Sequence, residues 1–155
     1  MAGVETRDFD SPDETRTPDK TQVDVVRIGA ATAARFAFEP GWRWSECVKP
    51  VAGTESCQAR HVGVAHAGRI AVKHEDGTEL EIGPGDAYVI EPGHDAWVVG
   101  DERFIGFEFE QRSAEEYAKG CTVESRFTGS PARWCRQLDP RDRGRTGRPA
   151  SPGRR

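Results

Sequence analysis

The chain has 155 residues, of which 35% are hydrophobic, and a formal net charge of −4. This length suits one domain that buries a sizeable core. No apolar run approaches the roughly 20 residues that a membrane-spanning helix needs, and the acidic amino terminus lacks the apolar stretch of a secretory signal. These features exclude a membrane-spanning helix and predict a soluble, cytoplasmic protein.

The two ends of the chain differ in composition from its middle. Residues 1–20 hold six acidic and three basic residues, whereas residues 130–155 hold eight arginines against two aspartates, with repeated Pro and Gly. Neither end has enough large apolar side chains to offset the entropy of ordering. We therefore predict disordered tails over 1–20 and 130–155 and a single domain over 21–129. Deleting 1–20 and 139–155 is then expected to leave the melting temperature almost unchanged.

The arginine-rich end raises the question of a nucleic-acid partner. Such a tail could contact nucleic acid or another acidic partner, although a simple solvated tail is the favoured interpretation. The segment between the two tails is acidic, which argues against nucleic-acid binding by the domain itself.

The middle of the chain alternates apolar and polar residues with period two, and turn-forming Gly, Pro and Asp residues interrupt it. This pattern predicts short antiparallel strands. In chain order they are 23–28, 34–38, 42–45, 57–65, 69–73, 79–82, 87–90, 96–99 and 104–109. Strands this short and closely spaced are typical of an all-β barrel or sandwich. A helix is predicted only over 113–119, where Ser113 and Glu116 would form a capping box.

Four cysteines, at positions 47, 57, 121 and 135, lie far apart and form no Cys-x-x-Cys pair. In a cytoplasmic protein, this spacing favours free thiols over a disulfide framework.

The segment 83–95, GPGDAYVIEPGHD, carries the most functional information. It predicts a tight turn, a strand and a second turn, with His94 and Asp95 at the mouth of that second turn. A Gly-Asp pair, a short apolar strand and a Pro-Gly pair together resemble the second sequence motif of the cupin superfamily. The resemblance implies a single antiparallel, jelly-roll-like β-barrel with a metal or a small ligand in its mouth. It also implies a homodimer.

The second motif departs from the cupin pattern at its ligand position. A metal-binding histidine usually follows the Pro-Gly glycine by three residues in the family, but Ala96 stands there in this chain. His94 follows the glycine directly. Either His94 takes the role of that ligand, or the ligand is absent.

The first cupin motif is also altered. In the family, a His-x-His pair precedes a Glu and then a Gly. Aligning Gly68 with that glycine puts His61 at the Glu position, and Cys57 and Glu55 at the two His positions. The resemblance thus places other metal-competent residues where the usual ligands stand.

These positions predict a three-residue metal site. Cys57 and His61 are an even number of residues apart on one predicted strand, so both side chains can point inward, and His94 on the opposing hairpin would complete the set. Cys and His ligands suit Zn, Fe or Cu, with Mn and Ni as further options. The alternative is that no metal binds, with Cys57 in the core, His61 as a hydrogen-bond donor and His94 as a turn residue.

Aromatic and polar residues near the predicted site suggest a ligand pocket. Tryptophans give large, stiff apolar walls with one N–H donor each, which would suit a planar apolar ligand. The predicted pocket residues are Trp42, Arg43, Trp44, Glu46 and Trp97. Asp95 is a candidate catalytic base or a hydrogen-bond partner of a ligand histidine, although such an aspartate more often caps its own turn.

Three functions are compatible with these residues. The first is a metal-dependent cupin enzyme of the oxygenase, isomerase or lyase type. The second is a non-catalytic cupin that senses a small ligand, and the third is a metal-free cyclase or dehydratase. A fold does not determine a reaction, so the prediction is a cupin that binds a small organic ligand at a divalent metal, with turnover left open.

Overall fold

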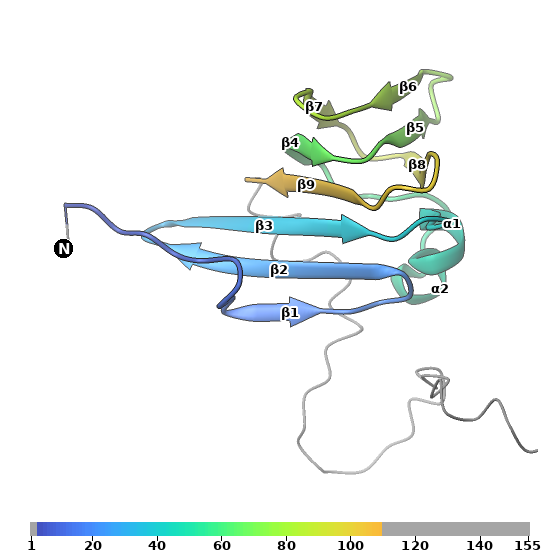
Figure 1. The fold of residues 1–155 in the computed structure, drawn as a ribbon. Helices are drawn as coiled ribbons and strands as arrows, with labels where there is room; N and C mark the ends of the chain where they lie inside the picture. Colours follow the sequence, from blue (N-terminus) through green and yellow to red (C-terminus); the bar gives the residue numbers. More distant parts are fainter. Residues whose placement is uncertain (1–2, 110–155) are drawn as a thin grey trace, which may run out of the picture. The chain divides into compact units, whose positions relative to one another are not determined.

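The computed structural model describes residues 3–109 of the chain (Figure 1). The predicted helix over 113–119, the predicted tail over 130–155 and the cysteines at 121 and 135 lie outside the described residues.

The described residues form antiparallel β-sheets and two short helices. The elements are β1 (Glu14–Arg16), β2 (Thr21–Ile28), β3 (Ala31–Phe38), α1 (Trp44–Cys47), α2 (Lys49–Ala52), β4 (His61–Ala67), β5 (Ile70–His74), β6 (Glu79–Ile82), β7 (Ala87–Ile90), β8 (His94–Val98) and β9 (Phe104–Glu108). One sheet has the order β1-β2-β3-β9-β4-β7 and the other has the order β6-β5-β8. The predicted all-β class is confirmed. In the described part of the chain, neither helix is long and apolar enough to cross a bilayer.

Period-two alternation places the core on one face of each sheet. Residues alternate between buried and more exposed positions along β4, β8 and β9, as expected for strands with one face against a core. One cluster of buried side chains joins both sheets, with Val25 and Phe36 from the larger sheet and Val72 and Val98 from the smaller one.

The amino-terminal segment is not a disordered tail in the described residues 3–20, which corrects the expectation from composition. Its strand β1 pairs with β2, with Glu14 opposite Val25. The side chain of Arg16 is completely buried, and its Nε donates to Glu14 at 2.7 Å. Strand pairing and ion pairs thus order a segment that has few apolar residues.

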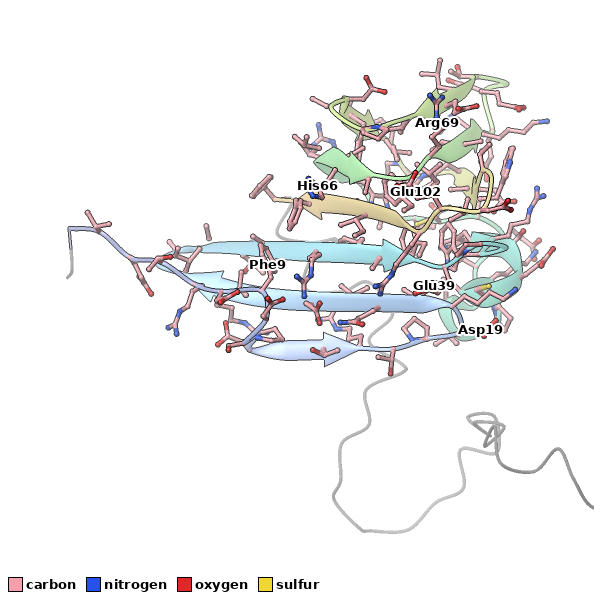
Figure 2. The ribbon with its side chains drawn as sticks, in the orientation of Figure 1. Phe9, Asp19, Glu39, His66, Arg69 and Glu102 are labelled. Carbon is pink, nitrogen blue, oxygen red and sulfur yellow. The ribbon has the colours of Figure 1, made fainter. Side chains whose placement is uncertain are left out.

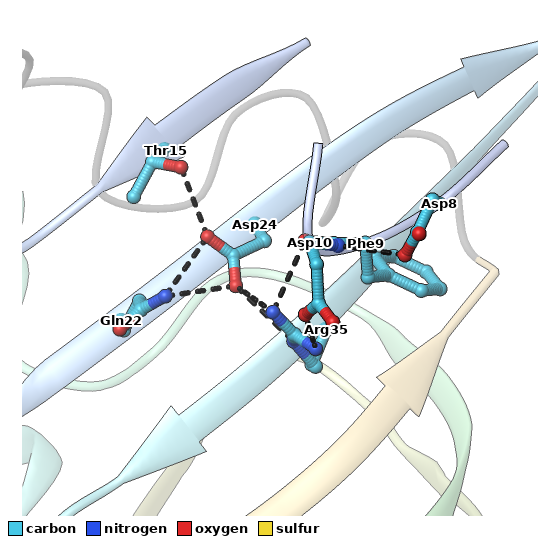
Figure 3. A network of polar contacts seen from close by, with 7 residues as sticks. All are labelled: Asp8, Phe9, Asp10, Thr15, Gln22, Asp24 and Arg35. Carbon is cyan, nitrogen blue, oxygen red and sulfur yellow. Dashed lines mark hydrogen bonds and ion pairs between the residues drawn. The ribbon is translucent and has the colours of Figure 1, made fainter. Parts of the chain in front are cut away.

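A polar network anchors the same segment to the outer face of β2 and β3 (Figure 3). Arg35 donates to Asp24 at 2.8 Å, to Asp10 at 2.9 Å and to the carbonyl of Phe9 at 3.1 Å. The ring of Phe9 also packs against Phe107, with centroids 5.3 Å apart. Phe9 is labelled in Figure 2. These contacts explain why the segment stays on the sheet.

The predicted strand over 42–45 is also wrong. Arg43 forms only an isolated bridge to Trp97, and α1 begins at Trp44. Trp42 and Trp44 are each 2% exposed. The turn that leads into α1 buries both side chains, and because they are two residues apart their pattern resembles that of a strand. The strand predicted over 57–65 begins only at His61, while Cys57 forms an isolated bridge to His94.

Candidate metal centre

The structure brings the three predicted ligands together. Cys57 precedes β4, His61 is the first residue of β4, and His94 is the first residue of β8. One ligand atom from each residue lies within 4.8 Å of the other two. Exposed fractions of 3%, 5% and 3% for Cys57, His61 and His94 show that the cluster is buried.

Backbone turns set the position of His94. The Asp86 carboxylate accepts the Gly83 N–H at 2.8 Å, which stabilises the turn before β7. Gly93 has φ +98°, a left-handed conformation that favours glycine. The Gly93 N–H donates to the Cys57 carbonyl at 2.7 Å, and the Cys57 N–H donates to the His94 carbonyl at 2.8 Å. The Gly-Asp and Pro-Gly pairs therefore fix the two turns that bring His94 beside Cys57.

Hydrogen bonds fix the tautomers of both histidines. His94 Nδ1 lies 2.7 Å from the Glu91 carbonyl oxygen, which can only accept, so Nδ1 must carry the proton. His61 Nδ1 lies 2.8 Å from the Glu108 carboxylate and donates to it in the same way. Each neutral imidazole then keeps its lone pair on Nε2. Metal-binding histidines commonly have this arrangement, in which an oxygen atom holds the other ring nitrogen.

The spacing of two of the donor atoms fits a metal ion. Cys57 Sγ and His61 Nε2 are 3.5 Å apart. Zinc–sulfur and zinc–nitrogen bonds of about 2.3 and 2.0 Å at tetrahedral angles separate two such ligand atoms by roughly 3.5 Å. The pair is therefore spaced for a common ion without rearrangement of either side chain.

Glu108 is the site residue that sequence reasoning missed, and it does not act alone. The Tyr88 hydroxyl donates to Glu108 Oε1 at 3.0 Å. Gly63 lies opposite both residues in the sheet, between Tyr88 on β7 and Glu108 on β9. A Cβ on Gly63 would lie 2.9 Å from the Tyr88 oxygen and 2.9 Å from Glu108 Cγ. The sequence held one indication that Glu108 belongs to the site. Glu108 is an acidic residue on the same inward face of the strand as Phe104 and Gly106.

The charges of the cluster shift two pKa values in opposite directions. Burial would raise the pKa of the Cys57 thiol, but hydrogen bonds with His61 and His94 outweigh it and lower the pKa to about 6. Burial would lower the pKa of His61, but the Glu108 charge and the bonds to Cys57 and Glu108 raise it to about 10. Without a metal, both shifts favour a thiolate on Cys57 paired with an imidazolium on His61.

A small cavity adjoins the cluster. Its volume is about 30 Å³, and its lining includes His61, His94, Glu108 and Tyr88, together with Phe38, Trp42, Trp44, Ile70, Ile90, Ala96 and Phe104. Two of the predicted pocket residues, Trp42 and Trp44, do line this cavity.

The other predicted pocket residues do not line it. The guanidinium of Arg43 lies 4.7 Å from the centroid of the Trp97 ring, and neither residue is among those that line the cavity. Glu46 is exposed on α1. Arg43, Glu46 and Trp97 therefore take no part in this cavity, and a ligand-binding role for them stays a prediction.

Asp95 is also placed away from the cavity. Its carboxylate accepts the Arg43 Nε–H at 3.0 Å, the Ser45 backbone N–H at 3.1 Å and the Ser45 hydroxyl at 3.0 Å. These bonds tie α1 to β8. Because His94 points inward, the next residue on the strand points outward, so Asp95 cannot act as a base inside the cavity.

The cluster could support two kinds of chemistry. Three protein ligands beside a cavity leave an open coordination position, as in catalytic metal sites. Alternatively, the hydrogen-bonded series Cys57, His61 and Glu108 has the order of a nucleophile, a base and the group that orients the base.

No family model matches the chain, and no curated protein matches it. Among solved structures, a protein of unknown function from Rhizobium leguminosarum bv. viciae 3841 is 17% identical over 70% of this chain and 97% of its own, with a TM-score of 0.51. A sugar phosphate isomerase of the cupin superfamily from Silicibacter pomeroyi is 16% identical over 68% of this chain and 74% of its own, with a TM-score of 0.50. KdgF from Halomonas sp. is 20% identical over 64% of this chain and 90% of its own, with a TM-score of 0.44.

The fold is cupin-like. At sequence identities this low, the similarity shows the fold alone. The activity has to be inferred from the residues of this chain.

Proposed function

We propose that this protein binds one divalent transition metal through Cys57, His61 and His94 and presents it to a small molecule in the adjoining cavity. The observation that carries the proposal is that both histidines direct Nδ1 to an oxygen atom and keep Nε2 for a ligand bond, beside a thiol. One thiolate and two imidazoles suit Zn, Fe(II) or Cu. When bound, such an ion supplies Lewis acidity or, as Fe or Cu, a redox centre.

The chain's own residues prepare the site in three ways. Glu108 holds the proton of His61 on Nδ1 and so fixes the ring for ligation through Nε2. Tyr88 donates to the second oxygen of Glu108 and fixes that carboxylate in turn. Apolar side chains, among them Phe38, Ile90 and Phe104, form much of the remaining cavity wall and restrict water.

The third donor favours a metal over nucleophilic catalysis by the thiolate. A thiolate nucleophile needs one base and one group to orient it, which His61 and Glu108 would supply. His94 is neither that base nor that orienting group, although it helps to lower the pKa of Cys57. It is buried, has a fixed tautomer and offers a third donor atom within 4.8 Å of the other two. A metal gives all three residues a role.

Metal titration of the purified full chain tests the proposal. After removal of metal, we expect elemental analysis to recover about one Zn(II) or Co(II) per chain, with strong visible absorption for the Co(II)–thiolate form. Cys57→Ser and His94→Ala should each abolish stoichiometric binding at micromolar metal. The matched control is Cys47→Ser, because Cys47 is the other buried free cysteine of the described residues. Full metal content in Cys57→Ser would sink the assignment.

Glu108→Gln gives a finer test of the same site. We expect metal affinity to fall about 10- to 100-fold because the partner of His61 loses its charge. Glu91→Gln is the matched control: Glu91 contacts His94 through its backbone carbonyl, while its carboxylate pairs with Arg60. Competition with a chromophoric chelator measures both affinities. Equal affinities in the two variants would contradict the role of Glu108.

A specific observation also supports a second candidate, thiolate chemistry without a metal. The Cys57–His61–Glu108 series would persist in a metal-free protein. If no metal binds and Cys57 reacts rapidly with a small electrophile at pH 7, this second function replaces the first.

A further inference from the structure

An open groove separates the last strands of the two sheets. In the described part of the chain, β6 pairs only with β5 and β7 pairs only with β4, so one edge of each strand lacks a partner strand. The groove between β6 and β7 has a volume of about 500 Å³. That volume is within the range of ligand sites in proteins and far exceeds the volume of the cavity beside the metal cluster.

The strands present their edges to this groove. Consecutive residues line it on both sides, Leu80 to Ile82 from β6 and Asp86 to Glu91 from β7 and its two ends. Successive side chains of a strand point to opposite faces of its sheet. A groove that consecutive residues line is therefore bordered by the edge of the strand, and a free edge offers its N–H and C=O groups to an added strand.

The floor of the groove is apolar and uncovered. Leu80 lies opposite the buried Val72 in the sheet and two residues before the buried Ile82, so its side chain is on the core side of β6. Leu80 is nevertheless 64% exposed. Tyr88 and Ile90 of β7 line the groove as well. Short strands and charged side chains protect free edges from pairing, but neither device accounts for an exposed apolar side chain on the core side. An added segment with apolar side chains would cover it.

Carboxylates surround this apolar floor. The acidic lining residues are Asp76, Glu81, Asp86 and Glu91. His74 is the one lining residue that can carry a positive charge. Just outside the lining, Arg69 pairs with Glu81 and Arg60 pairs with Glu91. The Asp76 and Asp86 carboxylates accept backbone N–H groups instead. The carboxylates outnumber these cationic groups even when His74 is protonated, so the groove attracts a cationic occupant.

We propose that an extended peptide segment of a partner protein, with alternating apolar and basic side chains, binds in this groove as an added strand on the free edge of β7. The edge of β7 supplies backbone hydrogen bonds, as in other cases of strand addition. The apolar side chains of the segment cover Leu80, and its basic side chains meet the carboxylates. The inference goes beyond the proposed metal site and does not depend on it, because no ligand of the cluster lines the groove.

Fluorescence anisotropy of a labelled synthetic peptide with the full chain tests the proposal. The probe alternates Val and Arg over about six residues, the length of the lining stretch of β7. We expect saturable binding, with and without a chelator. Replacing each Arg of the probe by Glu should weaken binding at least about 10-fold. N-methylation of every second residue removes the donors along one edge of the peptide, so one of the two alternate methylation patterns should abolish binding.

Leu80→Arg tests the groove from the side of the protein. It places a bulky cation on the floor, and like charges brought together should weaken binding of the Arg probe at least about 10-fold. Val51→Arg is the matched control, because Val51 is also an exposed aliphatic residue and does not line the groove.

Hydrogen exchange of the unaltered chain keeps the test valid if Leu80→Arg does not fold. The probe should slow amide exchange over 86–91 and leave exchange in β2 unchanged. Absence of saturable binding would overturn the inference, as would equal affinity for the Glu peptide, unimpaired binding of both methylated peptides, or unchanged exchange over 86–91. Sedimentation that shows a dimer of the full chain, dissociated by Leu80→Arg, would assign the groove to a second copy and also overturn it. Loss of metal binding in Cys57→Ser with peptide binding retained would leave both proposals standing as separate sites.

Discussion

At the scale of single residues, neighbours in sequence have opposite roles on β8. His94 belongs to the cluster of Cys57, His61 and His94, and Ala96 lines the cavity, whereas Asp95 and Trp97 contact α1 and Arg43. Strand alternation requires this division. The sequence motif located the right turn, but treating His94 and Asp95 as one functional pair ignored that alternation.

Cys57 provides a residue-scale prediction about pH. His61 and His94 stabilise the thiolate, so the pKa of Cys57 in the metal-free protein should be about 6, well below the 9.0 of an ordinary cysteine. The thiolate then persists as the pH falls from 9 and is lost only below about 6. Ultraviolet thiolate absorbance, taken as the difference between the parent chain and Cys57→Ser, measures this titration.

Cys47 supplies the control for the thiolate titration. Burial raises the pKa of its thiol, so Cys47→Ser should leave the absorbance below pH 9 unchanged. A Cys57 midpoint at or above 9 would show that the two histidines do not contact the sulfur as described.

At the scale of elements, a glycine on β9 makes room for the contacts of Glu108. Gly106 lies two residues before Glu108 on the same face of β9. A Cβ there would lie 2.8 Å from the Tyr88 oxygen and 3.1 Å from the Phe104 ring. The glycine therefore makes room for the Tyr88–Glu108 hydrogen bond.

This close approach predicts a non-additive pair of substitutions. Gly106→Ala should lower the free energy of unfolding by about 1–3 kcal/mol, as for other overpacked cores. The cost should shrink when Tyr88→Phe is also present, because the oxygen that the new methyl group meets is gone. Denaturant unfolding of the four chains measures the coupling. Strictly additive effects would show that Tyr88 does not fill the space beside Gly106.

Elements also show where sequence reasoning fails. The alternation and the turn residues together predicted strands that overlap β2, β3 and β5 to β9. It failed at Trp42 and Trp44, since a turn into α1 buries both residues at a strand-like spacing. Glu108 went unnoticed because its function depends on Tyr88 and His61, which come from other strands and meet it only in the folded sheet.

At the scale of the whole molecule, composition misjudged the amino terminus. The segment has few large apolar residues, yet it adds β1 to the sheet and covers the Asp24–Arg35 network. The segment is ordered by strand pairing and by ion pairs, and both depend on the residues of β2 and β3 that it contacts. Composition alone holds no information about those partners.

Deletion of residues 1–20 should therefore lower the melting temperature by at least about 5 °C, since losing 1–3 kcal/mol shifts a domain of this size by several degrees. The physical reason is the loss of β1 and of the Asp10 and Phe9 contacts to Arg35. Deletion of 1–7 is the control, because it keeps these contacts and should have a much smaller effect. Calorimetry compares the three chains, and an unchanged melting temperature after the longer deletion would restore the tail interpretation.

The two histidines of the cluster start strands of different sheets: His61 begins β4 of the larger sheet and His94 begins β8 of the smaller. An ion bound by both would act as a cross-link between the sheets, in the way that a disulfide ties distant segments. Its binding free energy would then add to the stability of the fold. Binding and release of the ion would be coupled to relative motion of the two sheets. A protein in which that motion is small would therefore hold the ion longer.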